Sequence, residues 1–429
     1  MAFDKQLFDS IIEEFTVAPE ELRTIAADFR YDLKQGLADP EQSSLRMLKS
    51  YLGLPTGKEQ GEYLALDFGG TNVRVLRIRL EGEGKFEILK KVAKPLIVEG
   101  EYDYIGASST KEQMFGLLAE LIDEAVEGNH EQKYLLGHTF SFPSSQTDVN
   151  NARLIIWTKE FATPGVEGEV VNDLLKEALD KRGLTNVEPV AVLNDTVAVL
   201  LSAAYKQSGT YIGSIYATGH NTCYLEPNVD GVPMILNLES GGFMKLLPSR
   251  FDNVIDEQSE KPGEQRLEKM VSGRYMGELY SLALSELLGA KDKWKSYGFT
   301  AIDLSGILAD EGKERSEVQK IVAERTGVSL TAAEAEMARD LAVAISKRSA
   351  RLVTATFVGI IWQQAGSGKA QKQHIAIDGS VYEKMPLAKE NIMRALSELL
   401  GEEAAVIDTV LENGGSGLGA AIAAAMSQK

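Results

Sequence analysis

The chain has 429 residues, and its 45 Lys and Arg residues against 63 Asp and Glu residues give a formal net charge of −18 at pH 7. A hydrophobic fraction of 44% and a charged fraction of 25% are ordinary for a globular protein of two or three domains, which excludes a disordered, collagen-like or coiled-coil chain. The net charge also excludes bulk binding to nucleic acid or an acidic membrane, because both are polyanions.

The predicted elements begin with helices over residues 4–50, where apolar side chains recur at helical spacing and Pro19 opens a second helix. Three strands follow over 62–93, and the first two are joined by a Gly-Gly-Thr-Asn turn that is typical of a β-hairpin. Next come a helix over 111–127, a strand over 133–142, a helix over 166–182 and a strand over 188–194. A hairpin followed by alternating strands and helices indicates the α/β class.

A second block begins near residue 211 and is similar to the first. Gly70 aligns with Gly219 and Asn72 with Asn221, each in a turn between two apolar strands, which indicates a duplicated pair of α/β domains with ligands bound between them. The remaining predictions are long helices over 263–365, strands over 374–378 and 405–407, and a last helix that begins in the glycine-rich residues 414–419.

Cysteine and histidine usage narrows the possible sites. The single cysteine, Cys223, excludes an internal disulfide framework and a cysteine-cluster metal site. The four histidines form no HExxH motif, so a zinc hydrolase is disfavoured. The acidic N-terminal segment is not a signal peptide, and no stretch reaches the ~18 apolar residues that span a bilayer. We expect a cytoplasmic protein.

The segment from Asp67 to Arg74 has the composition of a phosphate-binding turn. Glycines in a tight turn let backbone N–H groups approach a phosphate, while Thr71 and Asn72 add side-chain donors and Arg74 adds a permanent positive charge. Asp67 ends the strand, where its carboxylate is suited to order water around the magnesium ion of a nucleotide. A plain Gly-Gly hairpin that binds nothing is the alternative.

Other nucleotide-binding motifs are absent. Gly368-Lys369 is followed by Ala370 rather than the Ser or Thr of a Walker A motif, and residues 415–419 read GxGxG rather than GxGxxG. No protein-kinase catalytic loop precedes the Asp67-Phe-Gly sequence. A P-loop ATPase, a Rossmann dehydrogenase and a protein kinase are therefore all disfavoured.

Asn194 and Asp195 end an apolar strand and precede a helix. Asp195 is either the N-cap of that helix or a carboxylate that accepts a proton from a substrate hydroxyl, and its position alone favours the cap. Amide, hydroxyl, amine and carboxylate side chains also accumulate at other turns without a metal cluster, and such a set suits a polyhydroxyl ligand such as a sugar. Taken singly, each is more simply a solvated or capping residue.

Seven segments in chain order resemble the hexokinase family of the sugar kinase, actin and Hsp70 superfamily, and together they cover nearly the whole chain from Tyr63. They are LDFGGTNVRV (66–75), FSFPSSQ (140–146) with WTK (157–159), LNDT (193–196), ATGHNTCY (217–224), NLESGGF (237–243) with KPGEQRLEKMVSGRYMGEL (261–279), AIDGSVY (376–382) and GSGLGAA (415–421). The resemblance implies two ribonuclease-H-like (actin-like ATPase) α/β domains with mixed sheets, flanking helices and a cleft between them. The implied domains are residues 61–195 with 415–429, and residues 1–60 with 196–414.

The resemblance also implies the reaction, which is transfer of the γ-phosphate of ATP to the 6-hydroxyl of a D-hexose, the first step of glycolysis. Glucose is the expected hexose, with mannose or fructose also accepted. Asp195 is the implied general base, assisted by Lys159 and Arg74, and sugar binding is expected to close the domains. We expect D-hexose and MgATP as partners, no nucleic acid or membrane, and a monomer or homodimer.

The implied binding residues are carried over position by position. Those for the sugar are Ser141, Thr158, Lys159, Asn194, Asp195, Asn221, Glu239, Gln265 and Glu268. Those for ATP are Asp67, Gly69, Gly70, Thr71, Asn72, Arg74, Thr218, Gly219, Asp378, Gly379, Ser380 and Ser416. Mg²⁺ is expected to be bound through ATP and water, near Asp67 and Asp195, with no direct protein ligand.

Five residues depart from the usual family pattern, namely Glu160, Ser240, Lys261, Gly414 and Leu418. None of them replaces a catalytic group, but they leave the preferred hexose open. Two other functions also stay open. One is a sugar sensor that binds without turnover, which the retained Asp195, Lys159 and Arg74 disfavour. The other is an Hsp70- or actin-like ATPase, whose hydrolysis of ATP would be indifferent to sugar.

Overall fold

The structure, a computed structural model, describes residues 3–70, 72–158 and 160–428. The chain forms two compact units. Unit 1 comprises Met1–Met47, Ser214–Thr222 and Leu238–Leu411, and unit 2 comprises Leu48–Gly213, Cys223–Asn237 and Glu412–Lys429. These units differ from the predicted domains chiefly in residues 48–60, 196–213 and 223–237, which cluster with unit 2. The reason is packing, since apolar residues of these three segments share one core with the last helix.

Unit 2 contains a five-stranded mixed sheet in the order β10-β7-β2-β3-β4. Its strands are β2 (Gln60–Phe68), β3 (Asn72–Gly82), β4 (Lys85–Pro95), β7 (Tyr134–Phe140) and β10 (Val187–Leu193). The β2–β3 and β3–β4 pairs are antiparallel, whereas β2–β7 and β7–β10 are parallel. The predicted strands over 62–93, 133–142 and 188–194 are therefore confirmed, although β7 ends at Phe140, before the last two residues of its prediction. Two further two-stranded ladders pair β5 (Ile97–Val98) with β6 (Tyr102–Asp103) and β8 (Ser144–Ser145) with β9 (Arg153–Leu154).

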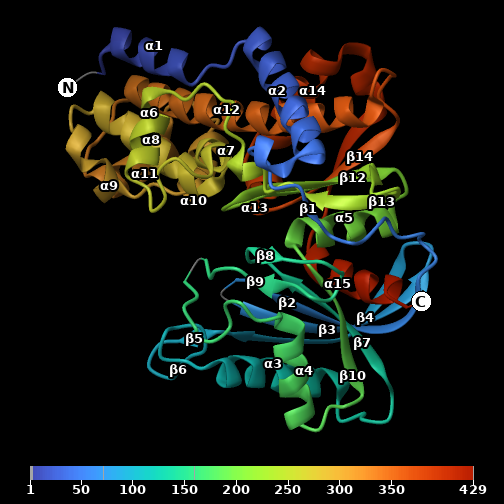
Figure 1. Cartoon of the computed structure of the whole chain (residues 1–429). Coiled ribbons are helices and arrows are strands. Elements are labelled where there is room, and N and C mark those ends of the chain that lie inside the picture. Colours follow the sequence, from blue (N-terminus) through green and yellow to red (C-terminus); the bar gives the residue numbers. More distant parts are fainter. Residues whose placement is uncertain (1–2, 71, 159, 429) are drawn as a thin grey trace. The chain divides into compact units, whose positions relative to one another are not determined.

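Alternating side chains of β2 serve two separate cores, because successive residues of a strand point to opposite faces. Leu64, Leu66 and Phe68 pack with α3 (Lys111–Val126) and α4 (Val171–Lys181), while Tyr63 and Ala65 pack with α5 (Asp195–Lys206) and α15 (Gly415–Met426). Figure 1 shows these helix pairs on the two faces of the sheet. The helix predicted over 111–127 is confirmed, and the one predicted over 166–182 begins later, at Val171.

The second half of the chain supplies most of a six-stranded sheet in the order β1-β13-β12-β11-β14-β15. Its strands are β1 (Leu48–Lys49), β11 (Thr210–Tyr216), β12 (His220–Val229), β13 (Val232–Asn237), β14 (Gln373–Asp378) and β15 (Ile407–Leu411). The prediction of a strand over 405–407 is wrong for its first two residues. Ala405 and Val406 are exposed and end a 3₁₀ helix, η4 (Gly401–Val406), so the strand begins only at the buried Ile407.

Helices make up most of unit 1. The long ones are α1 (Lys5–Glu14), α2 (Pro19–Ala38), α8 (Gly273–Leu287), α12 (Ala332–Ala365) and α14 (Ala388–Leu400). The shorter helices are α6 (Arg250–Glu257), α7 (Arg266–Val271), α9 (Trp294–Tyr297), α10 (Ala301–Ala309), α11 (Ser316–Thr326), α13 (Ser380–Lys384), η1 (Pro40–Gln42), η2 (Ser240–Gly242) and η3 (Lys291–Lys293). In Figure 1, α2 and α14 lie beside α12. The helices predicted over 263–365 are confirmed, whereas those over 4–50 end at Ala38, before η1 and β1.

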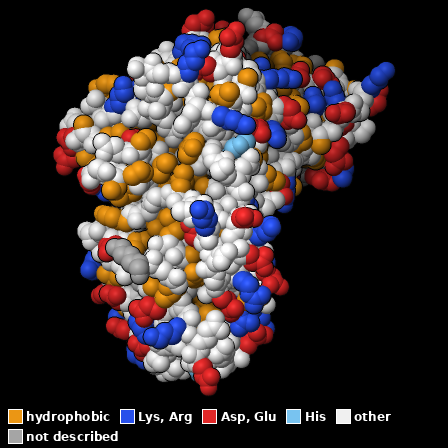
Figure 2. Space-filling model, turned by 90° about the vertical axis from the view of Figure 1, so that its right-hand side faces the viewer, with side chains coloured by type: hydrophobic (Ala, Val, Ile, Leu, Met, Phe, Trp, Pro, Cys, Tyr) orange, Lys and Arg blue, Asp and Glu red, His pale blue; other side chains and the backbone are white. Residues whose placement is uncertain are grey.

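Charged side chains of both signs share the surface. On the face shown in Figure 2, Lys and Arg side chains lie singly or in small groups among Asp and Glu side chains. Within the described ranges, no helix combines the length and the hydropathy needed to cross a bilayer.

Helix α15 lies so close to its neighbours that only glycine fits at its contact points. A Cβ atom on Gly419 would collide with the backbone of Ala198 in α5, and one on Gly137 of β7 would collide with the carbonyl of Ala420. Backbone atoms cannot swing away as the end of a long side chain does. These two contacts therefore fix α15 against both the sheet and α5.

This close approach predicts opposite effects for two helical Gly→Ala substitutions. Gly419→Ala should lower the unfolding free energy of unit 2 by about 1–3 kcal/mol, because the added methyl group overpacks a backbone contact. Gly116→Ala, where a Cβ meets nothing within 4 Å, should be neutral or stabilise α3 by up to ~1 kcal/mol through helix propensity. Denaturant unfolding of both variants measures this, and equal midpoints would contradict the packing described for α15.

Candidate functional site

Three predicted site segments follow strand ends at one edge of the unit 2 sheet. In the parallel pairs, Phe68 of β2 lies opposite Phe140 of β7, and Leu193 of β10 lies opposite Thr139. The residues that come next along the chain are Gly69, Ser141 and the Asn194–Asp195 pair. Ligands of open α/β sheets bind at the carboxyl ends of the strands, and this edge is of that kind.

The first glycine turn packs directly against Ser141. A Cβ atom on Gly69 would lie 2.8 Å from the Ser141 Cβ and 3.1 Å from its Oγ, so a larger residue would displace this serine. Gly70 has no such restriction, because a Cβ there would meet nothing within 4 Å. Asn72 is the first residue of β3, while Thr71 lies outside the described residues.

Asp67 and Arg74 lie opposite each other on β2 and β3. The Arg74 Nη1 is 3.1 Å from the Asp67 Oδ2, and the Arg74 side chain is 50% exposed. The sequence suggested separate roles for these residues, one near a phosphate and one near a magnesium-bound water, whereas the structure pairs them. A half-exposed ion pair stabilises a protein little, so an incoming phosphate can compete for the guanidinium.

Asn194, rather than Asp195, caps helix α5. The Asn194 Oδ1 accepts hydrogen bonds from the Thr196 backbone N at 2.9 Å and from the Thr196 Oγ1 at 2.6 Å. Asp195 is the first helical residue, and its Oδ1 lies 2.8 Å from the same Thr196 N. The cap favoured for Asp195 from its position alone is therefore wrong by one residue. The partly exposed Asp195 carboxylate sits at the positive end of the helix dipole.

A cluster of aromatic rings that no sequence motif predicted holds the Thr158 loop. It joins the ends of β2 and β7 to Trp157 and Phe161, and its members are Phe68, Phe140, Phe142, Trp157 and Phe161. The Trp157 Nε1 donates to the Thr163 carbonyl at 2.8 Å, and the Phe161 N donates to the Thr158 carbonyl at 3.4 Å. Lys159 lies outside the described residues. The repeated aromatics around FSF and WTKEF were the available signal.

Unit 1 gathers three predicted sugar-binding residues. The Asn221 Nδ2 lies 3.3 Å from the Glu239 Oε1, and the Asn221 Oδ1 accepts from the Ser240 N at 3.1 Å. The His220 N donates to the Glu268 Oε2 at 3.0 Å. An amide and two carboxylates thus meet around the first residues of β12.

Gln265 belongs to the same cluster. A Cβ on Gly241 would lie 2.6 Å from the Gln265 Oε1 and 3.0 Å from the Glu268 Cβ. Both Gln265 (φ 53°) and Glu239 (φ 50°) adopt the left-handed backbone conformation, which is uncommon for residues other than glycine. Such conformations persist only where the surroundings enforce them, and they concentrate at functional sites.

The second glycine turn contacts both this cluster and the predicted adenosine segment. A Cβ on Gly219 would lie 3.0 Å from the Glu268 Oε2, and the Thr218 carbonyl accepts from the Arg274 N at 3.2 Å. Gly379 has a φ of 132°, and a Cβ there would collide with the Tyr216 carbonyl, which puts Asp378 and Ser380 beside the turn. Ser416 belongs to unit 2, where its carbonyl accepts from the Thr139 Oγ1 at 2.8 Å.

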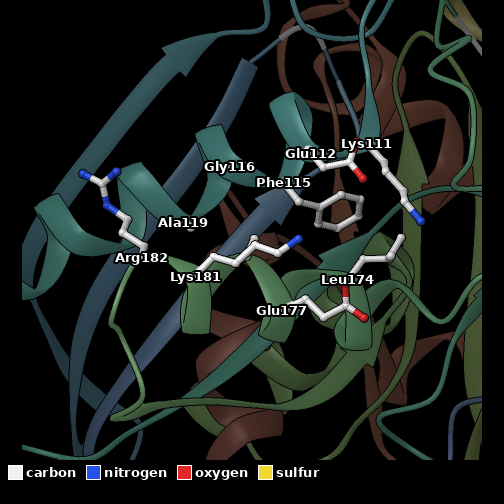
Figure 3. A pocket seen from close by; sticks show the side chains of 10 residues that line it. Lys111, Glu112, Phe115, Gly116, Ala119, Leu174, Glu177, Lys181 and Arg182 are labelled. Atoms are coloured by element: carbon white, nitrogen blue, oxygen red, sulfur yellow. The ribbon is translucent and has the colours of Figure 1, made fainter.

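A groove in unit 2 is formed by residues other than those predicted to bind sugar or ATP. Figure 3 shows a groove of about 280 Å³ between α3 and α4, lined by Lys111, Phe115, Leu174 and Lys181 among others. None of the residues predicted to bind sugar or ATP lines it. Among the residues that the structure describes, no group of three or more His, Cys, Asp or Glu side chains is arranged to hold a metal ion.

Comparison with known proteins gives the family. Two models of the hexokinase family match the chain, one over residues 7–205 and the other over residues 211–426. Hexokinase-1 of Schizosaccharomyces pombe is 34% identical, and the alignment covers 98% of this chain and 90% of that protein. The chain belongs to the hexokinase family. Membership in this family makes it an ATP-dependent sugar phosphotransferase.

Solved hexokinases share the fold. One hexokinase crystal structure has a TM-score of 0.88 and 33% identity over 98% of this chain and 99% of that chain. The hexokinase of Schistosoma mansoni in complex with glucose has a TM-score of 0.83 and 30% identity over the same shares. The two α/β units with mixed sheets are thus those of the actin-like fold that hexokinases have.

The cap bonds of Asn194 predict a difference between two substitutions. Asn194→Ala removes both bonds to Thr196 and should lower the unfolding free energy by about 1 kcal/mol. Asn194→Ser keeps a capping oxygen and should retain most of that stability. Thermal unfolding of the two variants measures the difference, and an equal loss in both would contradict the cap. A fall in hexose affinity in the stable Asn194→Ser variant would assign the amide to sugar binding as well.

Proposed function

We propose that the protein transfers the γ-phosphate of ATP to the 6-hydroxyl of a D-hexose, with glucose the first choice and mannose or fructose also accepted. The observation that carries this proposal is the shared strand edge of unit 2, where a glycine turn, the Ser141 hydroxyl and the Asp195 carboxylate follow three parallel strands. A structural relative of this chain was solved with glucose bound, which supports glucose as the hexose.

Asp195 acts as the general base in this proposal. Its carboxylate accepts the proton of the sugar 6-hydroxyl while the bond from that oxygen to the γ-phosphorus forms and the bond to the β-phosphate oxygen breaks, releasing ADP. Phosphoryl transfer needs in-line positioning more than covalent participation by the protein. The backbone N of Thr196, 2.8 Å from the Asp195 Oδ1, orients the carboxylate for this step.

The remaining site residues divide between sugar and nucleotide. Carboxylates and amides that accept and donate several hydrogen bonds each are suited to adjacent hydroxyl groups. We propose as sugar ligands Ser141, Thr158, Lys159, Asn194, Asn221, Glu239, Gln265 and Glu268. We propose as ATP contacts Asp67, Gly69, Gly70, Thr71, Asn72, Arg74, Thr218, Gly219, Asp378, Gly379, Ser380 and Ser416. Arg74 and Lys159 would offset charge on the transferring group, and closure of the protein around the sugar would exclude water.

Mg²⁺ fits the chemistry of these residues. It prefers oxygen ligands, keeps several waters and is usually held by substrate phosphates with one or two carboxylates. Asp67, at the end of β2 and 21% exposed, offers such a carboxylate next to the first glycine turn, with Asp195 on the same sheet edge. When bound with ATP, the ion would supply positive charge to the phosphate oxygens in a protein whose net charge is −18.

We also propose a cytoplasmic protein that is a monomer or a homodimer. The buried Cys223 donates its thiol to the Thr196 carbonyl at 3.1 Å, and burial raises the pKa of this thiol. An inert, buried thiol in a chain with one cysteine suits a reducing compartment.

The base assignment is tested by Asp195→Asn with Asp123→Asn as the matched control. Asn is nearly isosteric and keeps an oxygen for the Thr196 N, so Asp195→Asn should fold and bind glucose but lose at least ~100-fold in kcat, as loss of a general base does. Asp123 forms an ion pair with Arg182, the C-cap residue of α4. Asp123→Asn should therefore leave kcat unchanged. The measurement is ADP release coupled to a reporter enzyme, over a panel of hexoses with and without Mg²⁺.

Three outcomes would count against the proposal. Near wild-type turnover in Asp195→Asn would exclude this residue as the base. Glucose binding by the wild-type protein without ADP release would indicate a sensor rather than an enzyme. ADP release at the same rate with and without hexose would indicate an ATPase.

A further inference from the structure

We propose that His220 is a positioning residue, which fixes the orientation of the sugar-binding side chains Asn221, Glu239 and Glu268 through its backbone and its ring. This inference rests on the proposed function, since it takes the ligand of that cluster to be a hexose. His220 lies inside the second glycine turn segment, at the start of β12, where neither motif nor spacing marked it as a site residue.

The backbone of His220 bonds one of the three side chains and is covalently joined to the residue that carries a second. Its N–H donates to the Glu268 Oε2 at 3.0 Å, and Asn221 is the next residue of the chain. The orientation of the His220 peptide therefore affects the position of the Glu268 carboxylate and of the Asn221 backbone. Contacts that restrain the His220 ring therefore also restrain the backbone of this residue.

The ring is held at both nitrogens. His220 is 3% exposed, and its Nδ1 lies 3.0 Å from the Ile215 carbonyl oxygen. A carbonyl oxygen only accepts hydrogen bonds, so Nδ1 carries the proton and Nε2 is the acceptor in the neutral ring. Burial lowers the pKa of His220 to about 4, so the ring is neutral near pH 7. The edge of the ring also meets the Tyr216 ring, with centroids 6.2 Å apart.

The acceptor nitrogen, Nε2, faces Ser240, which follows Glu239, the residue of the third side chain, in the sequence. The Ser240 Oγ lies 3.5 Å from the His220 Nε2, and Ser240 is fully buried. Its backbone N donates to the Asn221 Oδ1 at 3.1 Å, and the residue before it is Glu239 in its left-handed conformation. The contacts of the His220 ring with the Ile215 carbonyl and with the Ser240 hydroxyl thus link the β11 backbone to the backbone next to Glu239.

The other fully buried histidine gives a matched control. His138 in unit 2 is also buried, and burial likewise lowers its pKa to about 4. Its Nδ1 bonds the Asn172 Oδ1 at 3.2 Å, while its Nε2 has no hydrogen-bond partner among the described residues. Burial of an imidazole is therefore common to both. The His138 ring meets the rings of Phe68 and Phe140, whereas the His220 ring is linked by polar contacts to the cluster of Asn221, Glu239 and Glu268.

The test compares His220→Phe, His220→Gln and His138→Phe. Phenylalanine keeps the ring volume and the contact with Tyr216 but loses both polar bonds, whereas glutamine keeps an acceptor that can reach Ser240. We expect His220→Phe to weaken glucose binding and raise its KM by about tenfold, the usual size for a lost buried hydrogen-bond partner. KM for ATP should change less than about twofold, glutamine should restore most of the glucose affinity, and His138→Phe should leave it unchanged.

Glucose affinity is measured by titration calorimetry and turnover by ADP release, so the two proposals fail in different ways. If the wild-type protein binds glucose without turnover, the proposed reaction fails, while the role of His220 is still read from the affinities. If His220→Phe binds glucose as the wild type does, the inference is overturned. It is also overturned if KM for glucose and for ATP rise together with a fall in Tm that His220→Gln does not reverse, because that pattern indicates packing alone.

Discussion

Parallel hydrogen bonding between β2 and β7, and between β7 and β10, brings the carboxyl ends of three strands to one edge of the unit 2 sheet. The residues that follow these strands are separated by tens of positions in the sequence. The register of the strands nevertheless brings them to the same edge of the sheet. The sheet is held in turn by two cores on opposite faces and by the glycine contacts of α15. A rigid scaffold of this kind positions short polar loops accurately.

The electrostatics of the site are local. With a net charge of −18 and carboxylates at positions 195, 239 and 268, the protein has no overall field that attracts a nucleotide. In the proposed reaction, the groups that would contact a polyanion are backbone N–H groups at the two glycine turns, the half-exposed Arg74 and the N-terminus of α5. Each of these acts at short range, and in the proposed reaction a metal ion bound with the nucleotide adds the remaining positive charge.

Much of the fold was predictable from the sequence because its signals are local. Alternating apolar residues and a Gly-Gly turn define the β2–β3 hairpin, and Pro19 with two glutamates defines the start of α2. The strand at 405–407 was misjudged because small apolar residues there are exposed, and only tertiary burial distinguishes Ile407 from Val406. The domain boundaries differed for a similar reason, since the packing of β13 on α5 and of α5 on α15 depends on residues far apart in the chain.

The site was predictable as a set of segments rather than as contacts. Asn194 and Asp195 are both suitable caps, and only the geometry of the first turn assigns the cap to Asn194. The pairing of Asp67 with Arg74 follows from cross-strand register, which motif spacing does not give. The aromatic cluster under Thr158 and the bonds of His220 involve residues with no chemistry of their own in the reaction, so no catalytic pattern marks them.

The central claim, that ATP is consumed to phosphorylate a sugar hydroxyl, is tested most directly by ³¹P NMR of the protein with ATP, Mg²⁺ and glucose. The account predicts that ADP and a phosphate monoester coupled to two methylene protons grow together, without inorganic phosphate, and that 6-deoxyglucose yields neither. Inorganic phosphate that accumulates equally with and without sugar would contradict it, as would glucose binding with no loss of ATP.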